Sequence, residues 1–251
     1  MRINTNVGAI TASRNVFVNN MAVESSMRKL SSGLRISRAG DDAAGLAIAN
    51  KLRAQHRALS TAAGNAEQGA ALLQIAEGAA STIERIIERQ KELLVQRASS
   101  QNSTVSSTLT TEITTLNTEI GRIRTAAKYQ GTSVFAANTF AVDEDGGTVG
   151  VDLSSYTAPT LPASVGDAET NLTAVNNILA TIGAGQNRLE YTVQNLKSAI
   201  VNVRAAESTI RDADMAEEMA TFTKNSILKQ AAEAMLSQAN QSSQGVLSLL
   251  R

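Results

Sequence analysis

Apolar residues recur along this chain at the alternating three- and four-residue spacing of amphipathic helices. Near the N-terminus the spacing holds for Ile3, Val7 and Ile10, and then for Val16, Asn20, Val23, Met27, Leu30 and Leu34. Near the C-terminus three- and four-residue steps hold for Met215, Met219 and Phe222, and then, after a step of six, for Leu228, Ala231, Met235, Ala239, Ser242, Val246 and Leu249. The pattern predicts a long helix at each end, reaching ~60 Å for ~40 residues.

The N-terminal pattern breaks at SSGLRISRAGDDAAG, residues 31–45. Glycines and serines interrupt the stripe, and two adjacent carboxylates precede the next apolar run. Asp is a favoured helix N-cap because its side chain accepts hydrogen bonds from the first backbone N–H groups. The segment therefore predicts a linker in which Asp41 or Asp42 caps a long helix from about Ala43 to Ser99.

The middle of the chain changes character twice. The polar run 99–107 predicts a turn, after which a helix from Leu109 to Ala127 folds back antiparallel on its predecessor. Residues 139–143 and 148–153 alternate with period two around EDGG, which predicts a β-hairpin near 139–153. Helical spacing returns between Leu172 and Val203.

Together these elements predict a mainly α fold, with a long-helix coiled-coil terminal pair, a helical bundle and a small β-hairpin. The pattern divides the chain into a terminal part and a middle part. The terminal part joins residues 1–42, a helix and linker, to residues 210–251. The middle part joins residues 43–170, which contain the hairpin, to the helix in 171–209.

The terminal stripes are thin, because Ala, Ser and Asn hold many of their positions. Weak isolated helices barely form in water. The stripes therefore predict that the ends are poorly ordered in the single chain and become ordered when neighbouring copies supply the missing burial.

Composition narrows the possible functions. Aromatic residues make up 3% of the chain, and Lys+Arg and Asp+Glu number 23 each. This charge balance gives no reason to expect nucleic acid as a partner. No apolar run approaches the ~20 residues of a membrane span. The N-terminal segment lacks the apolar region of a secretory signal, which fits the cytoplasm or export without a cleaved signal peptide.

Nothing in the sequence predicts catalysis. The chain has no Cys and one His, so we expect no enzyme, no cofactor and no metal site. The clustered acids are better explained as helix caps. They share the two linkers with basic residues, and we expect polar contacts there to fix the junction between the terminal and middle parts. The predicted junction residues are Arg35, Arg38, Asp41, Asp42, Arg211, Asp212 and Asp214.

Both ends of the chain resemble bacterial flagellins. At the N-terminus the resemblance rests on Ile3-Asn4-Thr5-Asn6, on LSSGLRISRAGDDAAGLAIANKLRAQ (30–55) and on NAEQG (65–69). At the C-terminus it rests on IRDADMAEE (210–218) and FTKNSILKQAAEAMLSQANQ (222–241). The resemblance spans about 1–130 and 170–251. The mid-chain holds only the hairpin region, so the chain looks like a minimal flagellin.

The resemblance implies a structural subunit that self-polymerises into the extracellular flagellar filament for motility. It also implies that residues 1–42 and 210–251 form the filament core domain and that residues 43–209 form an outer helical domain. It implies export in unfolded form through the flagellar type III apparatus, and order gained on assembly through the paired terminal helices. The implied partners are copies of the chain, an export chaperone at the C-terminal helix, and the hook-junction and cap proteins. The predicted self-assembly seam comprises Ile3, Val7, Ile10, Val23, Met27, Leu30, Leu34, Met219, Phe222, Leu228, Met235, Val246 and Leu249. Two alternatives remain, a hook–filament junction protein of the same architecture and a secreted helical adaptor.

Some flagellins are recognised by a toll-like innate immune receptor through an Arg-containing helix followed by Glu-Leu-x-Val-Gln. The matching residues here are Arg89, Glu92, Leu93, Val95 and Gln96, with Glu112 at an acidic position on the facing helix. Gln90 and Lys91 depart from the motif, where Val and Arg are usual. The resemblance implies a possible receptor contact at Arg89, Glu92, Leu93 and Glu112.

Overall fold

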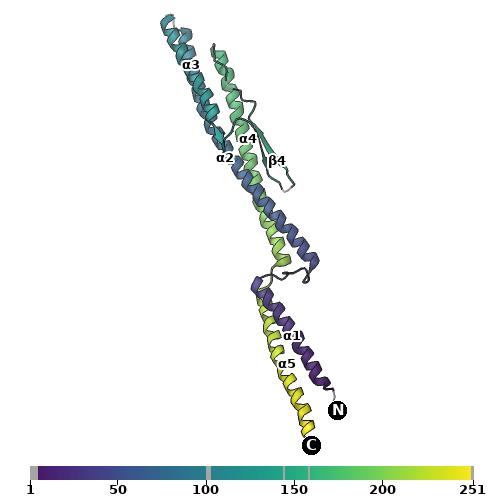
Figure 1. Ribbon diagram of the computed structural model, residues 1–251. Helices are drawn as coiled ribbons and strands as arrows, with labels where there is room; N and C mark the ends of the chain where they lie inside the picture. Colours follow the sequence, from purple (N-terminus) through teal and green to yellow (C-terminus); the bar gives the residue numbers. More distant parts are fainter. Residues whose placement is uncertain (1–4, 100–102, 144, 158, 250–251) are drawn as a thin grey trace. The chain divides into compact units, whose positions relative to one another are not determined.

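The computed structural model describes residues 5–99, 103–143, 145–157 and 159–249, with side chains as far as residue 242. Helices account for most of the described chain (Figure 1). They are α1 (Val7–Ser32), α2 (Ala43–Ser99), α3 (Ser103–Ala126), α4 (Val165–Arg211) and α5 (Met215–Leu249). With the small antiparallel hairpin described below, these helices confirm the predicted mainly α fold.

The chain divides into two compact units. Unit 1 comprises Met1–Ala54 with Val203–Arg251, and unit 2 comprises Gln55–Asn202. Both unit boundaries fall inside long helices, α2 and α4. The predicted domain boundaries after residues 42 and 209 fall instead near helix ends, and that division stays a prediction.

The first helix has a defined start and stop. The Asn6 side chain accepts a hydrogen bond from the backbone N–H of Ala9 at 3.1 Å and so caps α1. At the other end Gly33 adopts a left-handed conformation, with φ of 69°, and its N–H donates to the Lys29 carbonyl at 2.8 Å. Glycine adopts this conformation without the strain that a Cβ would cause. The predicted break in the helical pattern at residues 31–45 begins one residue before the observed end of α1 at Ser32.

The third helix begins earlier than expected. The predicted turn at 99–107 is wrong for residues 103–107, which belong to α3, and residues 100–102 lie outside the described chain. The polar side chains of this segment bond to the helix backbone. The hydroxyls of Thr108 and Thr110 donate to the carbonyls of Thr104 and Ser106, one turn earlier, at 3.1 and 2.9 Å. Such back-bonding lets a Ser/Thr-rich segment remain helical.

The predicted hairpin is confirmed. Strands β3 (Ala137–Ala141) and β4 (Thr148–Asp152) pair antiparallel, with Thr139 opposite Gly150. A second, two-residue pair was not predicted, formed by β1 (Lys128–Tyr129) and β2 (Thr132–Ser133). Its turn places Gln130 at φ of 49° and Gly131 at φ of 84°, so the glycine serves a left-handed turn position.

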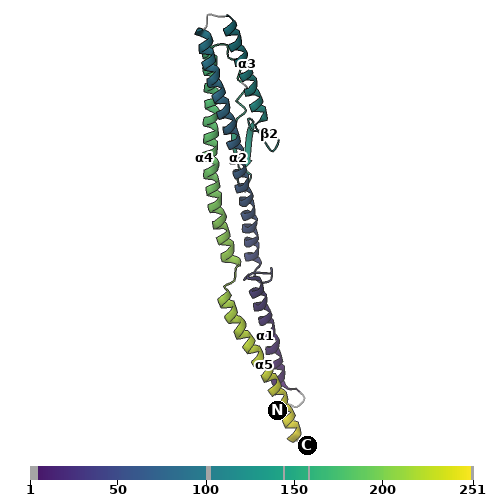
Figure 2. The same cartoon turned by 90° about the vertical axis from the view of Figure 1, so that its left-hand side faces the viewer.

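The core of unit 2 lies where three helices and the hairpin meet. Figure 2 shows α2, α3 and α4 side by side. Their fully buried side chains form one cluster with the inward face of β4. Its large members include Leu73, Ile83, Ile87, Ile120, Ile182, Leu189 and Val151. A smaller cluster of Leu93, Leu94, Leu109, Ile113 and Ala168 joins the same three helices elsewhere in the unit. Unit 2 thus carries the thick apolar core of the chain.

Candidate assembly site

The two terminal helices form an antiparallel pair within unit 1. Figures 1 and 2 show α1 and α5 lying side by side. At one end the Asn6 side-chain amide donates to the Ala239 carbonyl at 3.0 Å. Towards the other end Lys29 Nζ lies 3.6 Å from Glu218 Oε2. These polar contacts fix the register of one helix against the other.

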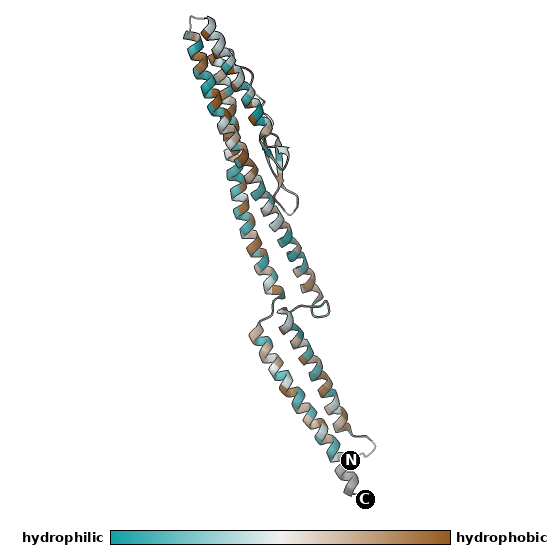
Figure 3. Ribbon diagram, turned by 60° about the vertical axis from the view of Figure 1, so that its left-hand side comes forward, coloured by the Kyte–Doolittle hydropathy of each residue, from teal (hydrophilic) through white to brown (hydrophobic). Residues whose placement is uncertain are grey.

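The seam between α1 and α5 is built from small side chains. On α1 only Ala12 and Ser26 are buried, at 8% and 3% exposure. Along α5 partial burial follows heptad-like spacing at Phe222, Asn225, Lys229, Ala232, Leu236 and Ala239. Hydropathy colouring shows polar and apolar residues mixed along both helices (Figure 3). Because burial stabilises roughly in proportion to apolar area, this seam gives much less stability than the core of unit 2.

The structure divides the predicted seam residues into two groups. Val23, Leu30, Leu34 and Phe222 are half-buried. The exposed members are Val7, Ile10, Met27, Met219, Leu228 and Met235. Ile3 lies outside the described residues, as do the side chains of Val246 and Leu249. The part that these residues play in assembly stays a prediction.

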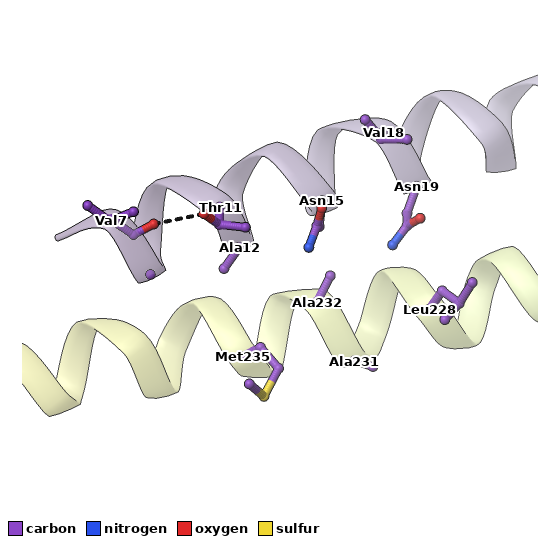
Figure 4. A pocket seen from close by; sticks show the side chains of 11 residues that line it. Val7, Thr11, Ala12, Asn15, Val18, Asn19, Leu228, Ala231, Ala232 and Met235 are labelled. Atoms are coloured by element: carbon purple, nitrogen blue, oxygen red, sulfur yellow. Dashed lines mark hydrogen bonds between the residues drawn. The ribbon is translucent and has the colours of Figure 1, made fainter.

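An open groove of about 610 Å³ runs between α1 and α5 (Figure 4). Asn15 and Asn19 point from α1 towards α5, where Ala232 faces them. Apolar side chains border the groove on both helices, including Val7 and Val18 on α1 and Leu228 and Met235 on α5. All four are more than two-fifths exposed, from 43% for Leu228 to 64% for Met235. A solvent-facing apolar border of this kind favours contact with another protein surface.

Aspartates in the two linkers accept hydrogen bonds from backbone N–H groups rather than from arginine side chains. Asp42 Oδ1 accepts from the Gly45 N–H at 2.9 Å and so caps α2, whose observed bounds match the predicted Ala43–Ser99. Asp214 Oδ1 accepts from the N–H groups of Ala216 and Glu217 at the start of α5. Asp41 Oδ2 accepts from the N–H groups of Arg38 and Ser37, which hold the pKa of this carboxyl below 3.8.

The two linkers meet through their backbones. Leu34 and Asp212 form an antiparallel bridge, and the Arg35 N–H donates to the Arg211 carbonyl at 2.7 Å. The Arg35 guanidinium donates to the Ile210 carbonyl at 2.7 Å. Several of the predicted junction residues are therefore brought together, although the contacts are arginine to carbonyl instead of arginine to aspartate. Their role in fixing the junction stays a prediction.

A buried carboxylate that was not predicted lies beside this linker contact. Glu207 is 5% exposed, and its Oε1 accepts from Arg53 Nε at 3.0 Å. Its Oε2 accepts from Arg204 at 3.1 Å, and Arg211 Nη1 lies 4.0 Å from Oε1. The spacings from Arg204 to Glu207 and from Glu207 to Arg211 place all three on one helix face. That pattern could have identified the cluster, whereas the partner on α2, Arg53, could not be read from sequence.

The residues of the predicted receptor contact lie in unit 2 and differ in exposure. Arg89 Nη1 lies 2.9 Å from Glu92 Oε2, and Arg89 Nη2 lies 3.4 Å from Glu112 Oε1. These hydrogen bonds raise the pKa of Arg89 above its usual value, and the bond to Glu92 makes the largest contribution. Leu93 is 1% exposed and packs in the smaller core cluster. Three predicted residues thus form a surface ion-pair group, and Leu93 is a packing residue of the folded unit.

Within residues 5–99, 103–143, 145–157 and 159–249, no group of three or more potential metal ligands gathers. No helix in this same part of the chain is long and apolar enough to cross a membrane. What the geometry does offer is a thin helix pair with exposed apolar borders.

Comparison with known proteins identifies the family. Residues 3–139 match the bacterial flagellin N-terminal helical region, and residues 165–250 match the bacterial flagellin C-terminal helical region. The chain belongs to the bacterial flagellin family. It is a structural subunit of the flagellar filament, and the structural character of the family agrees with the expectation of a non-enzymatic role.

Individual flagellins match over their whole length. The chain is 43% identical to a flagellin of Halalkalibacterium halodurans and 37% identical to a flagellin of Bacillus subtilis. It is 38% identical to the flagellar filament 33 kDa core protein of Treponema phagedenis. Each match covers 100% of both chains. A match to the crystal structure of Bacillus cereus flagellin covers 56% of this chain and 88% of that chain, at 21% identity and a TM-score of 0.40.

Proposed function

We propose that copies of this flagellin polymerise through their paired terminal helices into an extracellular filament that drives motility. The observation that carries the proposal is the exposed apolar surface of the α1–α5 pair. Phe17 on α1 is 65% exposed and Met235 on α5 is 64% exposed. Large apolar side chains gathered on the surface of one small helix pair favour burial against other molecules. Neighbouring copies of the same pair supply that burial.

Export in unfolded form through the flagellar type III apparatus is the second part of the proposal. The α1–α5 seam buries only small side chains on α1, so unfolding this pair costs little free energy. The same weakness makes order in the pair depend on neighbours, because assembly adds the burial that the single chain lacks. A thin seam therefore serves both export and assembly.

Seeded elongation tests this function. We expect the full chain, added to short filament seeds, to elongate them with a steady rise in light scattering. Chains lacking residues 1–40 or 212–251 should stay soluble, because each lacks one partner of the pair. A full chain that never elongates seeds would contradict the filament function. Undiminished elongation by either shortened chain would contradict the paired-helix mechanism.

The two alternatives are not favoured. A hook–filament junction protein or a secreted helical adaptor would share the terminal helices. The relatives that match over their full length are named flagellins and filament core proteins. Bulk elongation in the seeded assay separates the filament subunit from a junction protein, which would add once and stop.

The proposed export and assembly partners bind the same exposed surface of the α1–α5 pair. We propose that an export chaperone covers α5, where Ile227 and Leu228 are 61% and 43% exposed, and that hook-junction and cap proteins contact the same terminal pair. Burying these side chains before export would prevent premature self-association. A soluble complex of the full chain with the chaperone should block seeded elongation, and Ile227→Ser should weaken that complex measurably by titration calorimetry.

We propose a toll-like immune receptor as a further partner. The exposed ion-pair group of Arg89, Glu92 and Glu112 supports this, because Arg89 holds both carboxylates in a fixed arrangement on α2 and α3. Arg89→Ala should reduce receptor signalling by the monomer without altering its helix content. Equal signalling by the variant and the parent chain would remove Arg89 from the contact.

A further inference from the structure

Helix α1 carries a second apolar stripe on the face away from α5. The buried residue Ala12 marks the side that meets α5. At ~100° per residue, Ile10, Phe17 and Met21 lie about 140–180° around the helix from Ala12. Their exposures are 60%, 65% and 57%. These three residues, called the α1 ridge below, therefore point outward and take no part in the contact between α1 and α5.

The groove between α1 and α5 offers a receiving surface of matching character. Its border side chains Val18, Leu228 and Met235 are apolar and exposed, and its interior presents Asn15 and Asn19 (Figure 4). Helices pack when a row of side chains on one enters the space between rows on another. A ridge with two large aliphatic side chains and one aromatic ring suits an open groove with apolar borders.

We infer that the α1 ridge of one copy docks in the α1–α5 groove of the next copy. This inference rests on the proposed filament function and specifies which surfaces meet. The ridge and the groove are different surfaces of the same unit, so each copy uses one to bind its predecessor and the other to bind its successor. Such a head-to-tail contact continues without limit when the rotation does not close a ring.

The choice of a second copy as occupant follows from this pairing. A ridge meeting a ridge would be a self-complementary contact, which closes at the dimer and leaves the groove open. A filament needs a contact that each addition regenerates. Ridge to groove meets that need, because binding at the groove leaves the newcomer's own groove exposed for the next copy.

Introduced cysteines test the pairing directly, because the chain has no native Cys. Arg14→Cys lies on the ridge between Ile10 and Phe17, and Ala231→Cys lies in the groove, so neither change removes an apolar ridge residue. Filaments of the doubly substituted chain are grown on seeds, treated with a short bismaleimide and examined on a denaturing gel. We expect a ladder of covalent multimers, since each copy links to two others.

Matched variants make the result decisive. Replacing Ala231→Cys by Glu233→Cys moves the groove thiol about 160° around α5, and we expect the ladder to disappear. A ladder of equal strength from that control, dimers from Arg14→Cys alone, or no ladder from the ridge–groove pair would each overturn the inference. Wild-type chain that fails to elongate seeds would instead contradict the filament function itself.

Elongation rates give a second readout that does not depend on the cysteines. Phe17→Ser on the ridge and Leu228→Ser in the groove should each slow seeded elongation by roughly tenfold, the effect of about 1.4 kcal/mol. Glu233→Ser should elongate as the wild type does. Circular dichroism should show unchanged helix content for all three variants, because the substituted side chains are exposed. If either Phe17→Ser or Leu228→Ser elongated seeds at the wild-type rate, the inference would be overturned.

Discussion

The side chain of Val151 occupies the space that a side chain on Gly185 would fill. A Cβ built on Gly185 would lie 2.8 Å from Val151 Cγ2 and 3.0 Å from Leu73 Cδ1. Val151 belongs to β4, Gly185 to α4 and Leu73 to α2, so three elements approach one another closely at this glycine. The missing side chain on α4 allows the hairpin to lie against the helix pair.

Gly185→Ala should destabilise unit 2. A methyl group there overpacks the core, at a cost of about 1–3 kcal/mol. The matched control is Gly183→Ala on the same helix, where a Cβ would meet nothing within 4 Å. That change should stabilise by about 0.5–1 kcal/mol, because Ala loses less backbone freedom than Gly on helix formation. Urea unfolding followed by circular dichroism measures both, and equal effects would contradict the close approach.

The Glu207 cluster should be the most sensitive polar group of unit 1. Glu207→Ala leaves the 12% exposed Arg211 side chain without its nearest carboxylate and removes the partner of Arg53. Removing one member of a buried ion pair costs up to about 3–5 kcal/mol. Because Arg53 and Arg204 are 34% and 65% exposed, we expect a smaller loss of about 1–3 kcal/mol.

The exposed pair of Lys197 and Glu67 provides the control for that substitution. Both side chains are more than half exposed although Lys197 Nζ lies 2.9 Å from Glu67 Oε1. Glu67→Ala should change the unfolding free energy by less than about 1 kcal/mol, as is usual for surface ion pairs. If Glu207→Ala proved as mild as Glu67→Ala, burial would not govern the Glu207 cluster.

Sequence periodicity predicted the long helices well because their signals are local. The apolar spacing and the capping Asp42 lie within the segment that they define, so Ala43–Ser99 could be read directly. Val165, the start of α4, was missed because the predicted helix was counted from its first apolar repeat at Leu172. The signal was present in Ser164 and Asp167, which bond to each other's backbone N–H at 2.9 and 3.3 Å.

Partner choice could not be read from periodicity. The N-terminal spacing predicts that Val7 and Val23 both belong to the assembly seam. In the structure Val7 is exposed and Val23 is half-buried. Between Ile10 and Val16 the spacing slips to six residues, which moves the stripe to another face of the helix. Such a slip shows that two faces are apolar, but only the position of α5 determines which face is covered within the chain.

Acid should weaken the start of α4 through Asp167. Hydrogen bonds from the Ser164 side chain, and from the N–H groups of Ser164 and Ala163, lower the pKa of the Asp167 carboxyl below 3.8. The unfolded chain therefore takes up this proton at a higher pH than the folded chain does. The stabilisation by Asp167 is complete above pH 3.8 and is lost as pH falls through the lower, folded-state pKa.

Asp167→Asn tests this dependence. The variant should be less stable than the parent chain at neutral pH, and the difference should shrink as pH falls below 3.8. Thermal unfolding at a series of pH values measures it. Glu88→Gln, which alters an exposed carboxyl that caps no helix, should follow the parent curve. A stability difference for Asp167→Asn that is the same at every pH would show that the charge of Asp167 has no part in the cap.

Gln90 is a polar side chain in an apolar position. It is fully buried, and its Nε2 donates to the Ile113 carbonyl at 3.1 Å while Oε1 has no hydrogen-bond partner. A buried acceptor without a donor costs about 1–3 kcal/mol. Gln90→Leu removes that acceptor at similar volume, and the Ile113 carbonyl keeps its place in the helix. We therefore expect Gln90→Leu to stabilise unit 2 by about 1 kcal/mol.

Gln90→Ala separates polarity from volume. It also removes the unpaired acceptor, but it leaves a cavity between α2 and α3, so we expect a loss of about 1–3 kcal/mol relative to Gln90→Leu. Urea unfolding of both variants gives the comparison. If Gln90→Leu were less stable than the parent chain, the hydrogen bond to Ile113 would outweigh the unpaired oxygen. The glutamine would then act as a specific tie between α2 and α3 at the base of the Arg89 ion-pair group.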